Sequence, residues 1–261
     1  MTTPTSLPIV AMLGGCLADP EPARFNIVER SLRTAPSVQV AIEGQSVRLL
    51  FDTGWPGLSL EPGVLSALPR TGAGPYFRKS WGKPSAKLGL MPVTVALGGR
   101  TGTVRGVERS VEAFSPWAYY DIQGIAGMEV VTAIGSRLHY RPPNLAHITG
   151  TACPGVDEKI YVMTTVDGVS IEAFVDTGAI TTRLFRQGLA EDAMTLPNGT
   201  VVPAERLTEK QVQARAGGAI MDGRRLDAVL GWDNLRDLAW TLDACGQTIT
   251  FGPEPEDSAE G

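Results

Sequence analysis

The stretch RLLFDTGWPGLSL, residues 48–60, places a carboxylate directly after a short apolar run. Leu49, Leu50 and Phe51 are typical of a buried strand, and Asp52 follows them with no polar residue between. A charged group is costly to bury unless it has a partner or a chemical role. The position of Asp52 therefore predicts that another group in the chain accounts for it.

The chain contains a second copy of this pattern. Residues 38–54, VQVAIEGQSVRLLFDTG, align without a gap with residues 162–178, VMTTVDGVSIEAFVDTG, at an offset of 124. Each copy predicts a β-hairpin, in which an acidic-Gly turn joins two strands and the second strand ends in Asp-Thr-Gly. A single Asp before Gly is most simply a turn residue. Two copies at equivalent hairpin ends instead predict that Asp52 and Asp176 are partners.

A second motif recurs downstream of each Asp-Thr-Gly. Residues 124–131, GIAGMEVV, and residues 228–235, AVLGWDNL, each contain two apolar residues, a glycine, a bulky residue and an acid. A short helix is expected after each glycine, followed by a hairpin at residues 137–148 in one half and 240–251 in the other. The sequence therefore predicts two similar halves.

The paired Asp-Thr-Gly loops and the paired apolar-apolar-Gly motifs resemble those of aspartic peptidases, in the retropepsin-like and pepsin-like families. The resemblance implies an all-β, bilobal, pseudo-twofold fold of two β-barrel-like lobes with few short helices. It places the lobes at residues 36–150 and 157–252. An N-terminal segment (1–35), a linker (151–156) and an acidic tail (253–261) that we expect to be disordered complete the chain.

The resemblance also assigns roles to individual residues. It implies that Asp52 and Asp176 are the catalytic pair of an aspartic endopeptidase. The supporting residues that it implies are threonines that bond across the lobes, glycines that let the loops approach, and glycines of the downstream motif: Thr53, Thr177, Gly54, Gly178, Gly127 and Gly231.

The two loops differ in the residue that follows the glycine. Ala179 follows the second, close to the small residue usual in the family, and we expect it beside the substrate. The bulky Trp55 follows the first. Trp55 either shapes a substrate subsite or packs at the lobe interface, because tryptophan serves both purposes in proteins.

The implied chemistry needs only the two carboxyls and a water. Two carboxyls about 3 Å apart cannot both ionise easily, so they share one proton. The ionised member activates a water and the protonated member donates to the peptide carbonyl. No cofactor, metal or covalent intermediate is expected, and the enzyme is expected to act as a monomer because one chain holds both half-sites.

The middle of the first half is predicted to hold the substrate-covering flap. Residues 72–87 are rich in Gly and Pro, and three aromatic residues there could cover a peptide: Tyr76, Phe77 and Trp81. Residues 62–107 contain seven Lys and Arg and no Asp or Glu. This basic segment either faces the cleft and favours acidic peptides or is a solvated surface, and the sequence does not decide between them.

The net charge and the numbers of histidines and cysteines limit the kinds of partner and site that the sequence predicts. A net charge of −5 gives no reason to expect nucleic acid or an anionic membrane as a partner, so a peptide or protein substrate is expected. With two histidines, a zinc site or a Ser-His-Asp triad is poorly supplied. Of the three cysteines, Cys153 and Cys245 could pair.

The sequence near the N-terminus bears on the cellular compartment of the protein. Residues 13–16, LGGC, resemble a lipoprotein cleavage box, but no Lys or Arg precedes them and the apolar run is short. The sequence favours a cytoplasmic location, with a periplasmic lipoprotein anchored through Cys16 as the alternative.

Two other functions are compatible with paired carboxylates. One is a catalytically silent peptide-binding protein of the same fold, which the intact Asp52 and Asp176 argue against without excluding it. The other is a glycoside hydrolase, which requires a wider carboxyl separation than a shared proton allows.

Overall fold

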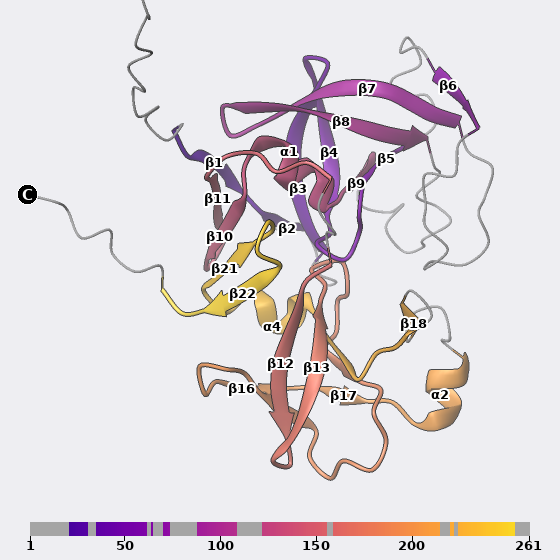
Figure 1. The fold of residues 1–261 in the computed structure, drawn as a ribbon, viewed down its shortest axis with the longest axis vertical. Helices are drawn as coiled ribbons and strands as arrows, with labels where there is room; N and C mark the ends of the chain where they lie inside the picture. The colour runs from indigo at the N-terminus through magenta and orange to yellow at the C-terminus, as the bar shows by residue number, and fades with distance from the viewer. Residues whose placement is uncertain are drawn as a thin grey trace, which may run out of the picture.

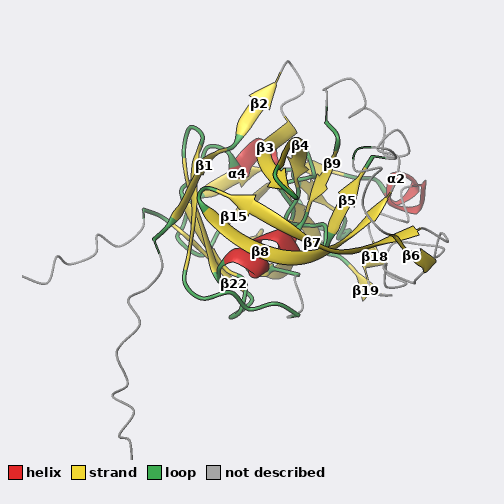
Figure 2. Cartoon of the chain, turned by 90° about the horizontal axis from the view of Figure 1, so that it is seen from above, coloured by secondary structure: helices red, strands yellow, loops and turns green. Residues whose placement is uncertain are grey.

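The computed structural model describes residues 21–30, 35–61, 64, 70–73, 88–108, 122–155, 159–214, 220–221 and 224–253. The fold is mostly β, with 50% strand and 9% helix, and two barrel-like sheets make it bilobal (Figures 1 and 2). The predicted all-β, bilobal class is thus confirmed. In Figure 1 the first-half barrel lies above and the second-half barrel below.

The first barrel is an eight-stranded sheet that closes through an additional pairing of β3 with β7. In spatial order its strands are β2 (Val28–Arg30), β3 (Ala35–Ile42), β4 (Gln45–Phe51), β9 (Gly124–Ala126), β5 (Leu58–Leu60), β8 (Arg100–Glu108), β7 (Leu88–Leu97) and β6 (Arg70–Ala73). Alternate residues of β3, such as Val38, Val40 and Ile42, are buried, as the period of a strand requires.

The second barrel is a seven-stranded sheet that is nearly closed. Its strands in order are β16 (Val201–Pro203), β15 (Ala193–Thr195), β12 (Tyr161–Val166), β13 (Val169–Val175), β20 (Ala228–Leu230), β14 (Arg183–Leu184) and β17 (Glu205–Arg206). Helix α2 (Glu209–Ala214) and the pair β18 (Ile220–Met221) and β19 (Arg224–Arg225) lie beside it.

The two predicted Asp-Thr-Gly hairpins are present with equivalent turns. Strand β3 pairs with β4, and β12 pairs with β13, both antiparallel. At the turns, Glu43 and Asp167 have φ of 47° and 52°, followed by Gly44 and Gly168 with φ of 80° and 74°. Two successive positive φ angles define the turn that matches the twist of a hairpin. The repeat in the sequence is therefore a repeat in the backbone.

A third sheet joins the two halves. It has five strands in the order β1 (Ala23–Asn26), β11 (Leu145–Thr149), β10 (Arg137–Arg141), β21 (Trp240–Asp243) and β22 (Thr248–Phe251). The hairpins that were predicted at the end of each half thus pair with each other through β10 and β21. Strands β1 and β2, which lie within the predicted N-terminal segment 1–35, pair with β11 and β3.

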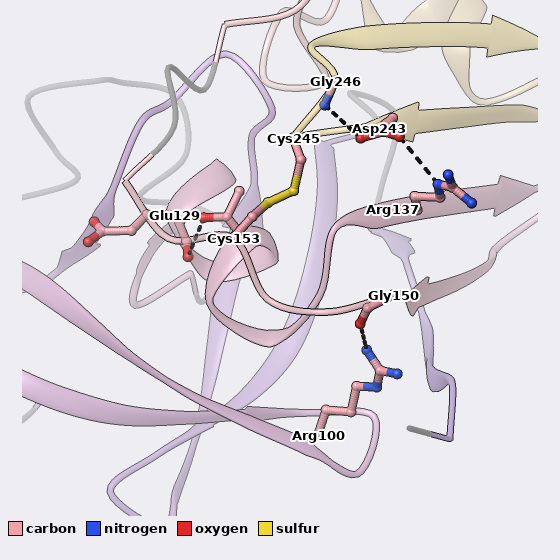
Figure 3. The surroundings of a disulfide bond; sticks show 9 residues. Arg100, Glu129, Arg137, Gly150, Cys153, Asp243, Cys245 and Gly246 are labelled. Carbon is pink, nitrogen blue, oxygen red and sulfur yellow. Dashed lines mark hydrogen bonds and ion pairs between the residues drawn. A yellow bond between two sulfur atoms is a disulfide. The ribbon is translucent and has the colours of Figure 1, made fainter. Parts of the chain in front are cut away.

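The five-stranded sheet and the linker are tied by a disulfide and side-chain contacts (Figure 3). Cys153 bonds to Cys245 in the β21–β22 turn, with 6.2 Å between the Cα atoms, so the bridge that the sequence allowed is present. Arg100 Nη1 donates to the Gly150 carbonyl at 2.8 Å. Arg137 pairs with Asp243 at 3.3 Å.

Some predicted features lie outside the described residues. These are the lipoprotein-like segment with Cys16, most of the predicted flap, and the tail from residue 254 onward. Among the helices that the structure describes, none has the length and apolar character needed to cross a membrane.

Candidate active site

The two Asp-Thr-Gly loops meet between the barrels through reciprocal hydrogen bonds. The Thr53 backbone N–H donates to the Thr177 hydroxyl at 2.9 Å, and the Thr177 N–H donates to the Thr53 hydroxyl at 3.0 Å. Each hydroxyl then donates to the other half, Thr177 to the Phe51 carbonyl at 2.8 Å and Thr53 to the Val175 carbonyl at 3.3 Å. Both threonines are buried. Exchanging the two halves leaves this pattern unchanged, as a pseudo-twofold axis requires.

The glycines of the loops allow the carboxyls to approach. A Cβ added to Gly54 would lie 2.5 Å from Asp176 Cγ, and one added to Gly178 would lie 2.3 Å from Asp52 Cγ. Real Cβ atoms do not tolerate such contacts, so neither position accepts a side chain without displacing the opposite carboxyl. Each glycine is therefore in contact with the carboxylate of the opposite half.

The carboxyls are held by backbone N–H groups and by each other. Gly54 N–H donates to Asp52 Oδ1 at 2.9 Å, and Gly178 N–H donates to Asp176 Oδ1 at 2.9 Å. Ala179 N–H adds a second bond to Asp176 Oδ1 at 3.0 Å. The two carboxyl groups also hydrogen-bond each other. A hydrogen bond between carboxyls requires one of them to carry a proton.

The surroundings raise the pKa of both acids. Burial raises the pKa of Asp52 well above its ordinary value, and the charge of Asp176 and the hydrogen bond to it raise this pKa further. Burial also raises the pKa of Asp176, against the opposing effect of hydrogen bonds from Asp52, Ala179 and Gly178. Each residue still keeps some solvent-exposed surface. The pair therefore holds a shared proton at a pH where an isolated aspartate is ionised.

In the second half, a network of buried polar side chains supports the loop. The Thr182 hydroxyl donates to Asp233 Oδ1 at 2.7 Å. It accepts from the Gly231 N–H at 2.9 Å and from Asn234 Nδ2 at 2.7 Å. Thr182 and Asn234 are buried. This network ties the strand after the loop to β20 and to the helix α4 (Trp232–Leu235).

In the first half, backbone groups hold the loop, and one of these bonds has a counterpart in the second half, where the Trp232 N–H donates to the Ala179 carbonyl at 2.7 Å. Gly127 N–H donates to the Gly57 carbonyl at 3.0 Å, and Met128 N–H donates to the Trp55 carbonyl at 2.9 Å as the helix α1 (Met128–Ile134) begins. At the offset of 124 residues, Leu58 occupies the position of Thr182, and it is fully buried. Gly127 and Gly231 pass under their loops so closely that an added Cβ would meet backbone within 2.2 Å and 2.7 Å, respectively.

Of the residues predicted to contact the substrate, the structure places Ala179 beside the dyad. Trp55 is 3% exposed, and its Nε1–H donates to the Ser59 hydroxyl at 3.1 Å within its own half. Ala179 is partly exposed beside Asp176. Tyr76, Phe77 and Trp81 lie outside the described residues. Arg100 of the basic segment binds the Glu21, Ile134 and Gly150 carbonyls rather than the dyad.

The Thr182 network was not predicted from the sequence. The acid that follows the apolar-apolar-Gly motif was visible, and Asp233 is that acid in the second half. Its contact with Thr182 joins residues 51 positions apart, so no local sequence pattern predicts it.

No metal site is evident in the described part of the chain, which contains no cluster of three or more His, Cys, Asp or Glu residues suited to hold an ion. The carboxyls of the dyad accept hydrogen bonds from backbone N–H groups of their own loops. A comparison with models of known protein families finds no match for this chain, and a comparison with curated proteins finds none either.

Proposed function

We propose that this protein is an aspartic endopeptidase whose catalytic residues are Asp52 and Asp176. The observation that carries the proposal is the pair of facing carboxyls, each in contact with the glycine of the opposite loop and held by reciprocal threonine bonds. Such a pair favours one shared proton, which provides an acid and a base at a single point.

The reaction begins with a water between the two carboxyls. The ionised carboxyl accepts a proton from the water, the water oxygen attacks the peptide carbonyl carbon, and the protonated carboxyl donates to the carbonyl oxygen. The resulting neutral diol collapses when one of its hydroxyls returns a proton to the pair and the pair protonates the nitrogen. The C–N bond then breaks, giving an acid and an amine, and the pair keeps one proton throughout.

The glycoside hydrolase alternative is disfavoured by the carboxyl separation. Glycosidase carboxyls stand about 5 Å or more apart to flank a sugar. Here the carboxyls of Asp52 and Asp176 are within hydrogen-bonding distance of each other. A silent peptide-binding protein shares the same geometry, so only an activity measurement separates it from the peptidase.

The test is digestion of a peptide library between pH 3 and 7. The wild type is expected to cleave, and Asp52→Asn and Asp176→Asn are each expected to lose about a thousandfold or more of the rate, because each removes the acid-base pair. Asp237→Asn is the matched control, since Asp237 is exposed and its carboxylate pairs with Arg236. Binding of peptides without cleavage by the wild type would instead support the silent peptide-binding protein.

The disulfide bears on where this activity operates. Disulfides persist in oxidising compartments and are rare in the cytosol. The Cys153–Cys245 bridge therefore favours the periplasmic alternative over the cytoplasm. Thiol labelling of the protein taken directly from its host, before and after reduction, tests this.

A further inference from the structure

The outer face of the five-stranded sheet carries a basic row that the proposed peptidase does not use. Strand pairing places Arg24 opposite His147, and His147 opposite His139. Alternate residues of the same strands, such as Ala146 and Leu138, are fully buried on the other face. The row therefore lies on the side of the sheet that faces away from the core.

This row borders a hollow of about 270 Å³. Arg24, Arg141, His139 and His147 line it together with the hydroxyl residues Thr149 and Thr241, and no Asp or Glu does. Neither arginine has an ion pair within the described residues. An acidic protein thus presents a hollow in which arginines, histidines and hydroxyl groups lie beside apolar residues such as Leu145 and Trp240.

The two imidazoles are fixed in this hollow. They stack with ring centroids 4.5 Å apart and 9° between the planes. His139 is 8% exposed, and its ring nitrogens contact the Thr241 hydroxyl at 3.0 Å and the Thr149 hydroxyl at 2.9 Å. A histidine imidazole donates from at least one of its ring nitrogens. At least one of these threonine hydroxyls therefore accepts from His139 and keeps its own hydrogen to donate to a ligand.

Like charges that face each other across strands destabilise a sheet. The charged and titratable residues on this face are Arg24 from β1, His147 from β11, Arg137, His139 and Arg141 from β10, and Asp243 from β21, while β22 places threonines there. Asp243 pairs with Arg137, so it does not offset the rest of the row. An anion in the hollow would balance the charges of Arg24 and Arg141.

We propose that this hollow binds a small free oxyanion of the sulfate or phosphate class, held by Arg24 and Arg141. Guanidinium groups suit such ligands because they present paired N–H donors. The imidazoles and threonine hydroxyls of the hollow add further polar groups beside them. Because the hollow is lined from β1, β10 and β11 of the first half and β21 of the second, the anion would also bridge the halves.

The test is calorimetric titration with sulfate at pH 5.5 and at matched ionic strength in chloride. We expect one sulfate site and a melting temperature that rises with sulfate concentration. Arg24→Gln and Arg141→Gln are each expected to weaken binding about tenfold.

Arg137→Gln is the matched control, because it removes the same charge from the same face while Arg137 is already paired with Asp243. It is expected to change the affinity less than about twofold. The proposal is overturned if sulfate binds the wild type no better than chloride at pH 5.5. It is equally overturned if Arg137→Gln weakens binding as much as the other two arginine variants, since that indicates general charge screening. Both exposed arginines can be changed without disturbing the buried core.

Discussion

The two half-sites are alike at the axis and unlike beneath it. At the axis, the threonine bonds and the glycine contacts are reciprocal. Beneath it, a backbone bond from the start of the helix to the loop is present in both halves, but the second half adds the Thr182 hydroxyl and its buried partners, where the first half has Leu58. The comparison teaches that the shared proton depends on the reciprocal threonine and glycine contacts. The groups beneath the two Asp-Thr-Gly loops can differ between the halves, provided that they hold each loop in place.

The largest effect is expected where the halves are most alike. Gly54→Ala and Gly178→Ala each add a Cβ within 2.5 Å of the opposite carboxyl carbon, so the opposite carboxyl must be displaced. Each variant is expected to lose about a thousandfold of peptidase rate, because the acid-base pair is broken. Gly246→Ala is the control, since its nearest contact would be an aspartate side chain at 3.2 Å. Near-normal rates in both loop variants would mean that the close approach is not required.

The next largest effect concerns the disulfide, which is bonded to the final hairpin of the second half and has no counterpart at the final hairpin of the first half. The β21–β22 turn is bonded through Cys245 to Cys153 in the linker, and no such bond holds the equivalent turn of the first half. Cys153→Ser with Cys245→Ser is expected to lower the free energy of unfolding by about 3 kcal/mol, because the bridge closes a long loop. Urea unfolding measures this. An unchanged midpoint, with the slope unchanged, would show that the sheet holds without it.

The asymmetric layer itself is tested by Thr182→Val. This change leaves the Gly231 N–H without its acceptor and removes one of the two bonds of the Asn234 amide, which keeps its bond to the Pro203 carbonyl, at an expected cost of about 2 kcal/mol. We expect kcat to fall with KM unchanged, and Thr182→Ser to restore it. Leu58→Val is the counterpart in the first half and is expected to lower stability by about 1 kcal/mol with kcat preserved. Equal losses of kcat in both would remove the distinction between the halves.

The smallest effect is a pH dependence of stability. The folded-state pKa of each aspartate is raised, so the stability that the pair provides is complete below the ordinary aspartate pKa and is lost as the pH rises through the raised value. Asp52→Asn and Asp176→Asn are therefore expected to be more stable than the wild type at pH 7 by about 1 kcal/mol and not at pH 3. Urea unfolding at both pH values checks this, and an advantage independent of pH would contradict it.

The sequence predicts the symmetric features better than the asymmetric ones. The hairpins, their turns and the acidic pair follow from a local pattern that occurs twice. The Thr182–Asp233 contact and the pairing of β10 with β21 join distant residues, and strand period alone does not choose a partner. Trp55 could not be assigned from sequence because tryptophan suits both a subsite and packing. Its burial and its bond to Ser59 now place it within the first half.

The shared proton is tested most directly by carbon NMR of protein labelled at the aspartate carboxyl carbons. The signals of Asp52 and Asp176 are assigned by their absence in the two Asn variants, and their shifts are followed from pH 2 to 8. We predict two coupled steps, with one proton retained well above the usual aspartate range and lost at lower pH in either single variant. Two independent titrations near the ordinary value would contradict the account.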